Sequence, residues 1–168
     1  MKLATLCYIF NKDKSKLLML HRNKKEDDMH KDNYVAIGGK IEAGESPRSS
    51  IIREIHEETG LVLNNIRYRG IIYYGQLNGE KIHPVLDWYI YVYDAITDEK
   101  VLEKNEEGDL HWINLNEILN EKINLWPTEK YVVKLIIDDK PILELEGWYD
   151  MNMNLCKVIQ RDLDLYKI

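Results

Sequence analysis

The sequence has little cysteine, and none of its apolar runs is long. Cys7 and Cys156 are the two cysteines among 168 residues, and no CxxC or Cys/His spacing surrounds them. This excludes a disulfide framework and argues against a zinc ribbon, while a single bridge between the two stays open. No run approaches the roughly 20 apolar residues of a membrane-spanning helix. We therefore expect a protein of the reducing cytoplasm that has no membrane contact.

The chain also lacks an excess of basic residues. It has 23 lysines and arginines against 29 aspartates and glutamates, a formal net charge of −6. Binding of polymeric nucleic acid through a broad basic surface is therefore not expected. A small anionic ligand is compatible with this charge if metal ions shield it. The sequence leaves open whether the protein is a monomer or a homodimer.

No repeat, low-complexity tract or Pro/Gly/Ser-rich linker divides the chain, so we expect a single domain over residues 1–168. Asn11-Lys12-Asp13-Lys14, and not a small-residue cleavage site, follows the first apolar run, which therefore predicts a strand instead of a leader. The expected strands are Leu3–Phe10, Lys16–His21, Ile66–Tyr74, Val85–Tyr93 and Leu110–Ile113, then a hairpin with arms Ile142–Tyr149 and Leu155–Tyr166.

Two helices are expected among these strands. Ser46 is a good N-cap, Pro47 suits the first helical position and Gly60 is a good stop, which predicts one helix of about thirteen residues. Apolar residues at helical spacing predict a second helix over Thr128–Ile137. The Gly38-Gly39 pair predicts a tight turn. Strands mixed with only two helices indicate an α/β or α+β sandwich and not a regularly alternating nucleotide-binding fold.

Three carboxylates gather on one side of the first predicted helix. Glu54, Glu57 and Glu58 lie at positions i, i+3 and i+4, so they span an arc of roughly 100°. Like charges this close repel one another, and a hard cation such as Mg²⁺ or Mn²⁺ would remove the repulsion. The pattern indicates metal-assisted phosphoryl chemistry, in which a further carboxylate accepts the proton of the attacking water. A solvated acidic helix face is the alternative.

The spacing around these carboxylates favours the metal site. After Gly39 come five residues and Glu45, then seven residues and the run Arg53-Glu54-Ile55-His56-Glu57-Glu58-Thr59-Gly60-Leu61. This pattern resembles the signature of the Nudix hydrolases at every fixed position. The resemblance implies an α/β/α sandwich around a mixed β-sheet, and cleavage of a nucleoside diphosphate that is linked to another group.

The resemblance also implies a role for each residue of the signature. The metal ligands would be Glu54, Glu57, Glu58 and the carbonyl oxygen of Gly38, and the metal Mg²⁺ or Mn²⁺. Arg53 would pair with Glu45 and orient the helix, which makes Glu45 structural more than catalytic. Outside the signature, Glu107 would complete the metal site or serve as general base.

Other segments resemble the MutT-type branch, which removes 8-oxo-dGTP and related oxidised purine nucleotides. They are Leu3–Tyr8, Leu17–Lys25, Leu86–Tyr89, Glu107–Trp112 and Leu125–Pro127. This resemblance implies a hydrolase of nucleoside triphosphates that releases the monophosphate and pyrophosphate. The alternatives are a Nudix hydrolase for an ADP-sugar, a dinucleoside polyphosphate or an RNA 5′ end, and a Nudix-fold nucleotide sensor without catalysis.

The same branch implies how a small nucleotide substrate binds. Trp126 would stack on the purine and Glu129 would hydrogen-bond its edge; a core aromatic that anchors the second helix is the alternative for Trp126. The chain departs from the mammalian enzyme at Thr128, where that enzyme has an acid, and at Val35, where it has an asparagine that reads the base. The further candidate substrate contacts are Thr5, Arg22, Lys24, Lys40 and Asp87, the last of which is alternatively a sheet-edge residue.

The five histidines show no HExxH motif and no paired spacing. We therefore expect surface or structural roles, and no metal ligation, for His21, His30, His56, His83 and His111.

Overall fold

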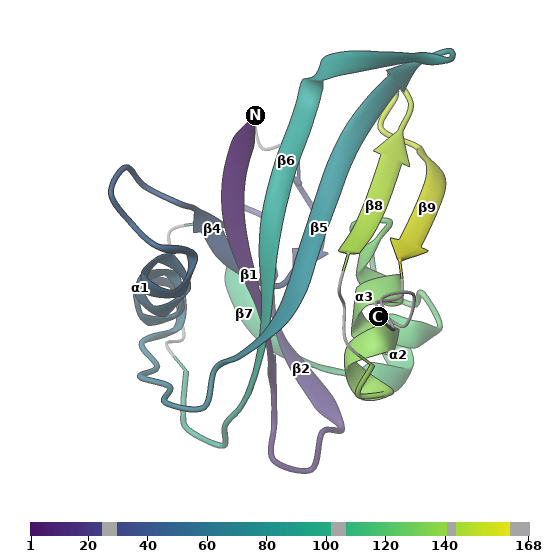
Figure 1. The fold of residues 1–168 in the computed structure, drawn as a ribbon. Coiled ribbons are helices and arrows are strands. Elements are labelled where there is room, and N and C mark those ends of the chain that lie inside the picture. The colour runs from purple at the N-terminus through teal and green to yellow at the C-terminus, as the bar shows by residue number, and fades with distance from the viewer. Residues whose placement is uncertain (25–29, 102–106, 141–143, 162–168) are drawn as a thin grey trace, which may run out of the picture.

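In the described part of the chain, the strands form one mixed β-sheet of nine strands with helices on both of its faces (Figure 1). The computed structural model describes residues 1–24, 30–101, 107–140 and 144–161. In chain order the elements are β1 (Lys2–Phe10), β2 (Lys16–His21), β3 (Tyr34–Val35), β4 (Ile37–Lys40), α1 (Pro47–Thr59), β5 (Arg67–Asn78), β6 (Lys81–Ile96), β7 (Asp109–Asn114), α2 (Leu115–Leu119), α3 (Glu129–Ile137), β8 (Glu144–Tyr149) and β9 (Leu155–Arg161).

The strand order is β3-β2-β1-β6-β5-β8-β9, with β4 paired to β1 and β7 paired to β2. The pairs β1–β6 and β5–β8 are parallel, and the other pairs are antiparallel. On one edge of β1, β2 pairs only at Ile9 and Phe10, and β4 takes over from Ala4 to Cys7. The sheet therefore divides beside β4, and β2 and β7 diverge from that point.

Each face of the sheet has its own apolar core, because side chains alternate along the strands. Tyr8 and Phe10 of β1 pack on the side of α2 and α3. Cys7 and Ile9 pack on the opposite side with Ile51 of α1. Figure 1 shows α1 on one side of the sheet, and α2 with α3 on the other. The predicted α/β/α sandwich around a mixed sheet is thus confirmed.

Helix α1 begins and ends where the sequence predicted. Ser46 and Ser49 form a reciprocal capping box, in which each side chain accepts from the backbone N–H of the other residue. Pro47 follows at the first position, where a missing N–H costs nothing. Gly60 ends the helix in the left-handed conformation, at φ +72°. This helix carries the acidic residues. Because the capping box fixes where the helix begins, it also fixes which side of the helix these residues occupy.

The predicted tight turn at Gly38-Gly39 is wrong. Both glycines belong to β4, where Gly38 pairs with Leu6 and Gly39 with Thr5 of β1. At φ +149°, a side chain on Gly38 would also collide with the carbonyl of Thr5. The glycines are there because β4 approaches β1 and α1 closely, and not because the chain reverses.

Other boundaries differ more modestly from the prediction. Strands β5 and β6 extend well past Tyr74 and Val85, because the polar residues around their turn continue the hairpin. The short helix α2 had no periodic signal of its own. The C-terminal hairpin is present as β8 and β9, and the predicted residues 142–143 and 162–166 lie outside the described ranges.

The two cysteines are not bridged. Cys7 is fully buried in β1, and Cys156 is exposed on β9. The single disulfide that the sequence left open is therefore absent. In the described part of the chain, none of the helices has the length and apolar character needed to cross a membrane.

Candidate active site

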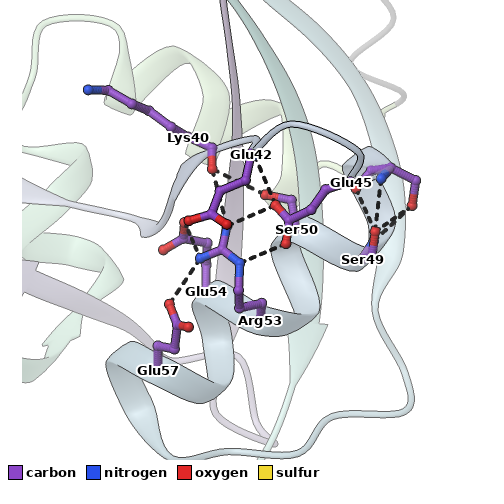
Figure 2. A network of polar contacts seen from close by, with 9 residues as sticks. Lys40, Glu42, Glu45, Ser49, Ser50, Arg53, Glu54 and Glu57 are labelled. Atoms are coloured by element: carbon purple, nitrogen blue, oxygen red, sulfur yellow. Dashed lines mark hydrogen bonds and ion pairs between the residues drawn. The ribbon is translucent and has the colours of Figure 1, made fainter.

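Arg53 is the hub of the acidic face of α1 (Figure 2). Its Nε and Nη2 donate to the two oxygens of Glu45 at 2.7 and 3.0 Å, and Nη1 donates to Glu54 and Glu57, each at 2.9 Å. Nη2 also reaches the carbonyl of Lys40 at 3.2 Å. The guanidinium lowers the pKa of Glu45 to about 2, so that carboxylate stays ionised. The predicted Arg53–Glu45 pair is present, and it ties the preceding loop to the helix.

Glu54 and Glu58 are turned into the protein. Side chain exposure is 13% for Glu54, and Glu58 is 7% exposed as a residue. The Glu54 carboxylate lies against Gly39, where a Cβ atom would stand 2.5 Å from Oε1. Glu58 accepts a hydrogen bond of 2.9 Å from the backbone N–H of Gly38. The two glycines of β4 thus form the surface on which both carboxylates rest, a role that the sequence analysis missed.

Burial makes these carboxylates reluctant to ionise. It raises the pKa of Glu58 to about 8 and also raises the pKa of Glu54, and the charge of Glu107 raises both further. Glu107 reaches this place because β2 and β7 pair next to it, with His21 opposite Asp109. Glu107, which precedes β7, therefore lies near enough to Glu54 and Glu58 of α1 for its charge to act on both carboxylates.

Glu107 is held by Arg22 through an ion pair across the ends of β2 and β7. The guanidinium of Arg22 also favours ionisation of Glu58, and so opposes the effect of burial on the pKa. The carboxylates of the site are thus flanked by two cations, Arg53 on α1 and Arg22 at the end of β2.

The donor set suits a hard divalent cation. Its atoms are carboxylate oxygens, and two of the carboxylates are buried with raised pKa values. A cation among them would offset both the burial and the mutual repulsion that disfavour their charge. Within the described ranges, however, no three Asp, Glu, His or Cys side chains gather closely enough to enclose an ion. Glu57 is 56% exposed and bonded to Arg53, so its ligand role, like that of the Gly38 carbonyl, stays a prediction.

The predicted phosphate contacts have different surroundings. Arg22 pairs with Glu107 at the site, whereas Lys24 donates to the carbonyl of Gly108 at 2.9 Å and pairs with Asp109 at 3.1 Å. Figure 2 shows the side chain of Lys40 extending away from the Arg53 network. Of the three cations, Arg22 is the one that the described contacts join to the carboxylates.

Two further candidate substrate contacts lie on β1 and β6. Thr5 is fully buried opposite Gly39, and no hydrogen bond within the described residues satisfies its hydroxyl. Because cross-strand neighbours share a face, Thr5 lies on the same side of the sheet as Glu54. Asp87 of β6 is half-buried and forms an ion pair of 2.8 Å with the amino group of Met1. Nothing in the described residues links Asp87 to the carboxylates.

Trp126 and Glu129 lie on the opposite side of the sheet, at the start of α3. Trp126 is 6% exposed and packs against His30 and Tyr149, with ring centroids 4.5 and 5.4 Å apart. This packing agrees with the alternative of a core aromatic. Glu129 is 2% exposed, and burial raises its pKa to about 7. Both side chains are therefore covered in this conformation.

Comparison with known proteins gives the family. The NUDIX domain matches residues 1–136, so the chain belongs to the Nudix family. Nudix hydrolases generally use divalent metals such as Mg²⁺ or Mn²⁺, and Nudix proteins of similar structure bind small nucleotide ligands. The membership supports an enzyme that hydrolyses a pyrophosphate linkage.

The individual relatives carry different descriptions. The uncharacterized Nudix hydrolase YvcI of Bacillus subtilis strain 168 is 35% identical over 112 residues, 66% of this chain and 68% of YvcI. The NAD-capped RNA hydrolase NudC of Actinobacillus succinogenes is 33% identical over 103 residues, which are 61% of this chain but 35% of NudC. The mutator MutT protein of Bacillus halodurans has a similar structure, with a TM-score of 0.79, 25% identity, and coverage of 95% of this chain and 97% of that chain.

Proposed function

We propose that this protein is a divalent-cation-dependent hydrolase of nucleoside triphosphates that acts on oxidised purines such as 8-oxo-dGTP. It releases the nucleoside monophosphate and pyrophosphate, and so removes damaged nucleotides from the pool. The observation that carries the proposal is that Glu54, Glu58 and Glu107 lie close enough for their charges to interact, in a fold similar to a MutT protein over 95% of the chain.

In this proposal the acidic residues divide into ligands and a base. Glu54, Glu57, Glu58 and the carbonyl of Gly38 would hold Mg²⁺ or Mn²⁺. When bound, the cation would neutralise the charge of the substrate phosphates and make the attacked phosphorus more electrophilic. Glu107 accepts the proton of the attacking water as general base. 

The positions of Glu54 and Glu57 are set by their neighbours. Arg53 holds both carboxylates through one nitrogen, and its second contact, with Glu45, prevents the guanidinium from rotating away. Since a displacement of about 1 Å in a catalytic group can cost on the order of 100-fold in rate, this fixed geometry matters for turnover.

The substrate would extend from the carboxylates of the site toward α3. Arg22, Lys24 and Lys40 contact the phosphates, Thr5 and Asp87 are additional contacts, and the base reaches Trp126 and Glu129. An indole is a good stacking platform, and a carboxyl group can accept or donate a hydrogen bond at a purine edge.

The direct test is turnover of 8-oxo-dGTP and dGTP with Mg²⁺, with the products separated by chromatography. We expect faster turnover of 8-oxo-dGTP, with formation of the monophosphate and pyrophosphate. Equal rates, or no activity with either compound, would remove the sanitising role and leave the family membership intact.

A second candidate is hydrolysis of another diphosphate-linked substrate, such as an RNA 5′ end or an ADP-sugar. The similarity to NudC favours it, because the carboxylate group binds a diphosphate and selects little beyond it. A panel of ADP-ribose, dinucleoside polyphosphates and capped RNA would identify this activity. Nucleotide binding without turnover of any of these compounds would instead indicate a sensor.

A further inference from the structure

The segment that joins Trp126 to Glu129 is anchored to the sheet by two tyrosines. Thr128 lies between these residues and is fully buried. Its hydroxyl lies 2.6 Å from the Tyr74 hydroxyl of β5, and the Tyr149 hydroxyl of β8 donates to it at 3.2 Å. Although Thr128 is the N-cap residue of α3, its side chain makes no capping bond. The hydroxyl is therefore used to attach the start of α3 to two strands.

The surroundings of Thr128 are shaped for this attachment. Gly147 of β8 faces it, and a Cβ atom there would stand 3.0 Å from the Thr128 methyl group and 3.2 Å from the Tyr74 ring. The rings of Tyr74 and Tyr149 also pack on each other, edge to face, at 5.6 Å. Tyr74 of β5, with Gly147 and Tyr149 of β8, thus leaves just enough space for the threonine side chain.

The anchor extends directly to the residues on either side of it. Tyr149 packs on the Trp126 ring, with centroids 5.4 Å apart. The backbone N–H of Glu129 donates to the carbonyl of Trp126 at 2.9 Å, which closes the turn. Trp126 and Glu129 therefore cannot shift relative to the sheet without disturbing the contacts of Thr128.

We propose that Tyr74 and Tyr149 are positioning residues for recognition of the nucleotide base: through Thr128 they hold Trp126 and Glu129 in place. This rests on the proposed function, in which those two residues contact the purine. It also gives a role to β8, which lies beyond the 136 residues that match the NUDIX domain.

The test compares a substrate that has a base with one that has none. The nucleotide is the better of 8-oxo-dGTP and dGTP, and ribose 5-triphosphate has the same phosphates without a base. Tyr74→Phe and Tyr149→Phe each remove one hydroxyl, Thr128→Val removes the shared partner, and Thr128→Ser keeps it. Tyr73→Phe is the matched control, since Tyr73 is the neighbour of Tyr74 on the opposite face of β5 and packs on Tyr89.

We expect the KM for the nucleotide to rise about fivefold in each Tyr→Phe variant, the effect of losing one hydrogen bond. It should rise further in Thr128→Val and stay at the parent value in Thr128→Ser and Tyr73→Phe. The kcat, and the hydrolysis of ribose 5-triphosphate, should stay unchanged. Thermal melting of each variant shows whether it is folded.

Three results would overturn the proposal. One is an unchanged KM in both Tyr→Phe variants, and another is an equal loss with both substrates, which is the mark of a general structural role. The third is a parent protein that hydrolyses ribose 5-triphosphate as well as the nucleotide. Failure of the proposed triphosphate hydrolysis looks different, since the parent then hydrolyses neither compound, whereas equal rates with 8-oxo-dGTP and dGTP remove only the preference for oxidised purines. Calorimetric binding of dGTP to the parent and to Tyr149→Phe decides the matter in that case, and equal affinities would reject a positioning role.

Discussion

The carboxylate of Glu54 rests on Gly39, so closely that a Cβ atom at position 39 would stand 2.5 Å from its nearer oxygen. The contact joins helix α1 to strand β4 at the point where the sheet divides. It makes the absence of a side chain at position 39 a condition for the placement of Glu54, a proposed metal ligand.

Gly39→Ala should therefore impair catalysis much more than folding. The added methyl group displaces the flexible end of Glu54, which costs little stability but moves the carboxylate by about 1 Å. We expect turnover to fall on the order of tenfold to 100-fold, with a melting temperature close to that of the parent. Steady-state kinetics and thermal melting measure the two effects. A variant with parental turnover would show that the position of Glu54 is not critical.

Glu57→Gln should nearly abolish hydrolysis while nucleotide binding persists. The side chain is 56% exposed, so the substitution disturbs no core packing, and the amide removes one negative charge from the proposed metal ligands. Binding is measured by calorimetry and turnover by product analysis. Glu80→Gln, at an exposed glutamate in the β5–β6 turn, is the control and should keep parental activity. Equal activity in the two variants would exclude Glu57 from the reaction.

Removal of divalent metal should stop catalysis and leave the fold intact. The capping box of Ser46 and the Arg53–Glu45 pair hold α1 without an ion. We expect a chelator to abolish turnover, Mg²⁺ or Mn²⁺ to restore it, and either cation to raise the melting temperature by mass action. Glu58→Gln should weaken this thermal shift. Persistent hydrolysis in excess chelator would contradict the assignment of the carboxylates as ligands.

Glu129 should make stability depend on pH. Burial raises its pKa from 4.5 to about 7, so between these values the folded state keeps a proton that the unfolded state releases. The free energy of unfolding should therefore fall as pH rises through this window, by roughly 3 kcal/mol, with no further change from this group above pH 7. Glu129→Gln should remove this contribution and leave that of Glu58, whose pKa is also raised by burial. Urea titrations of both proteins at pH 5 and pH 8 measure the free energies of unfolding. The same change between the two pH values in the parent and in Glu129→Gln would contradict the prediction.

Local signals made α1 and its ion pair predictable. Ser46, Pro47 and Gly60 define the helix by their own backbone preferences, and the resemblance to the Nudix signature implied the pairing of Arg53 with Glu45. Such features depend on residues near one another in the sequence, or on a motif long enough to be specific.

Features that depend on distant strands could not be predicted in the same way. A Gly-Gly pair indicates a turn by composition, yet Gly38 and Gly39 lie in β4, because Thr5 and Glu54 approach them closely. The burial of Trp126 and Glu129 likewise depends on tyrosines from β5 and β8. No periodicity around Trp126 contains that information.

The separation of the two cysteines provides a probe of the fold. Cys156 is exposed on β9, whereas Cys7 lies in the centre of β1 between β4 and β6, with its pKa raised by burial. A thiol reagent should modify the native protein once and rapidly, and a second time only when β1 detaches. The rate of the second modification therefore measures how fast β1 detaches from the sheet, without any engineered label.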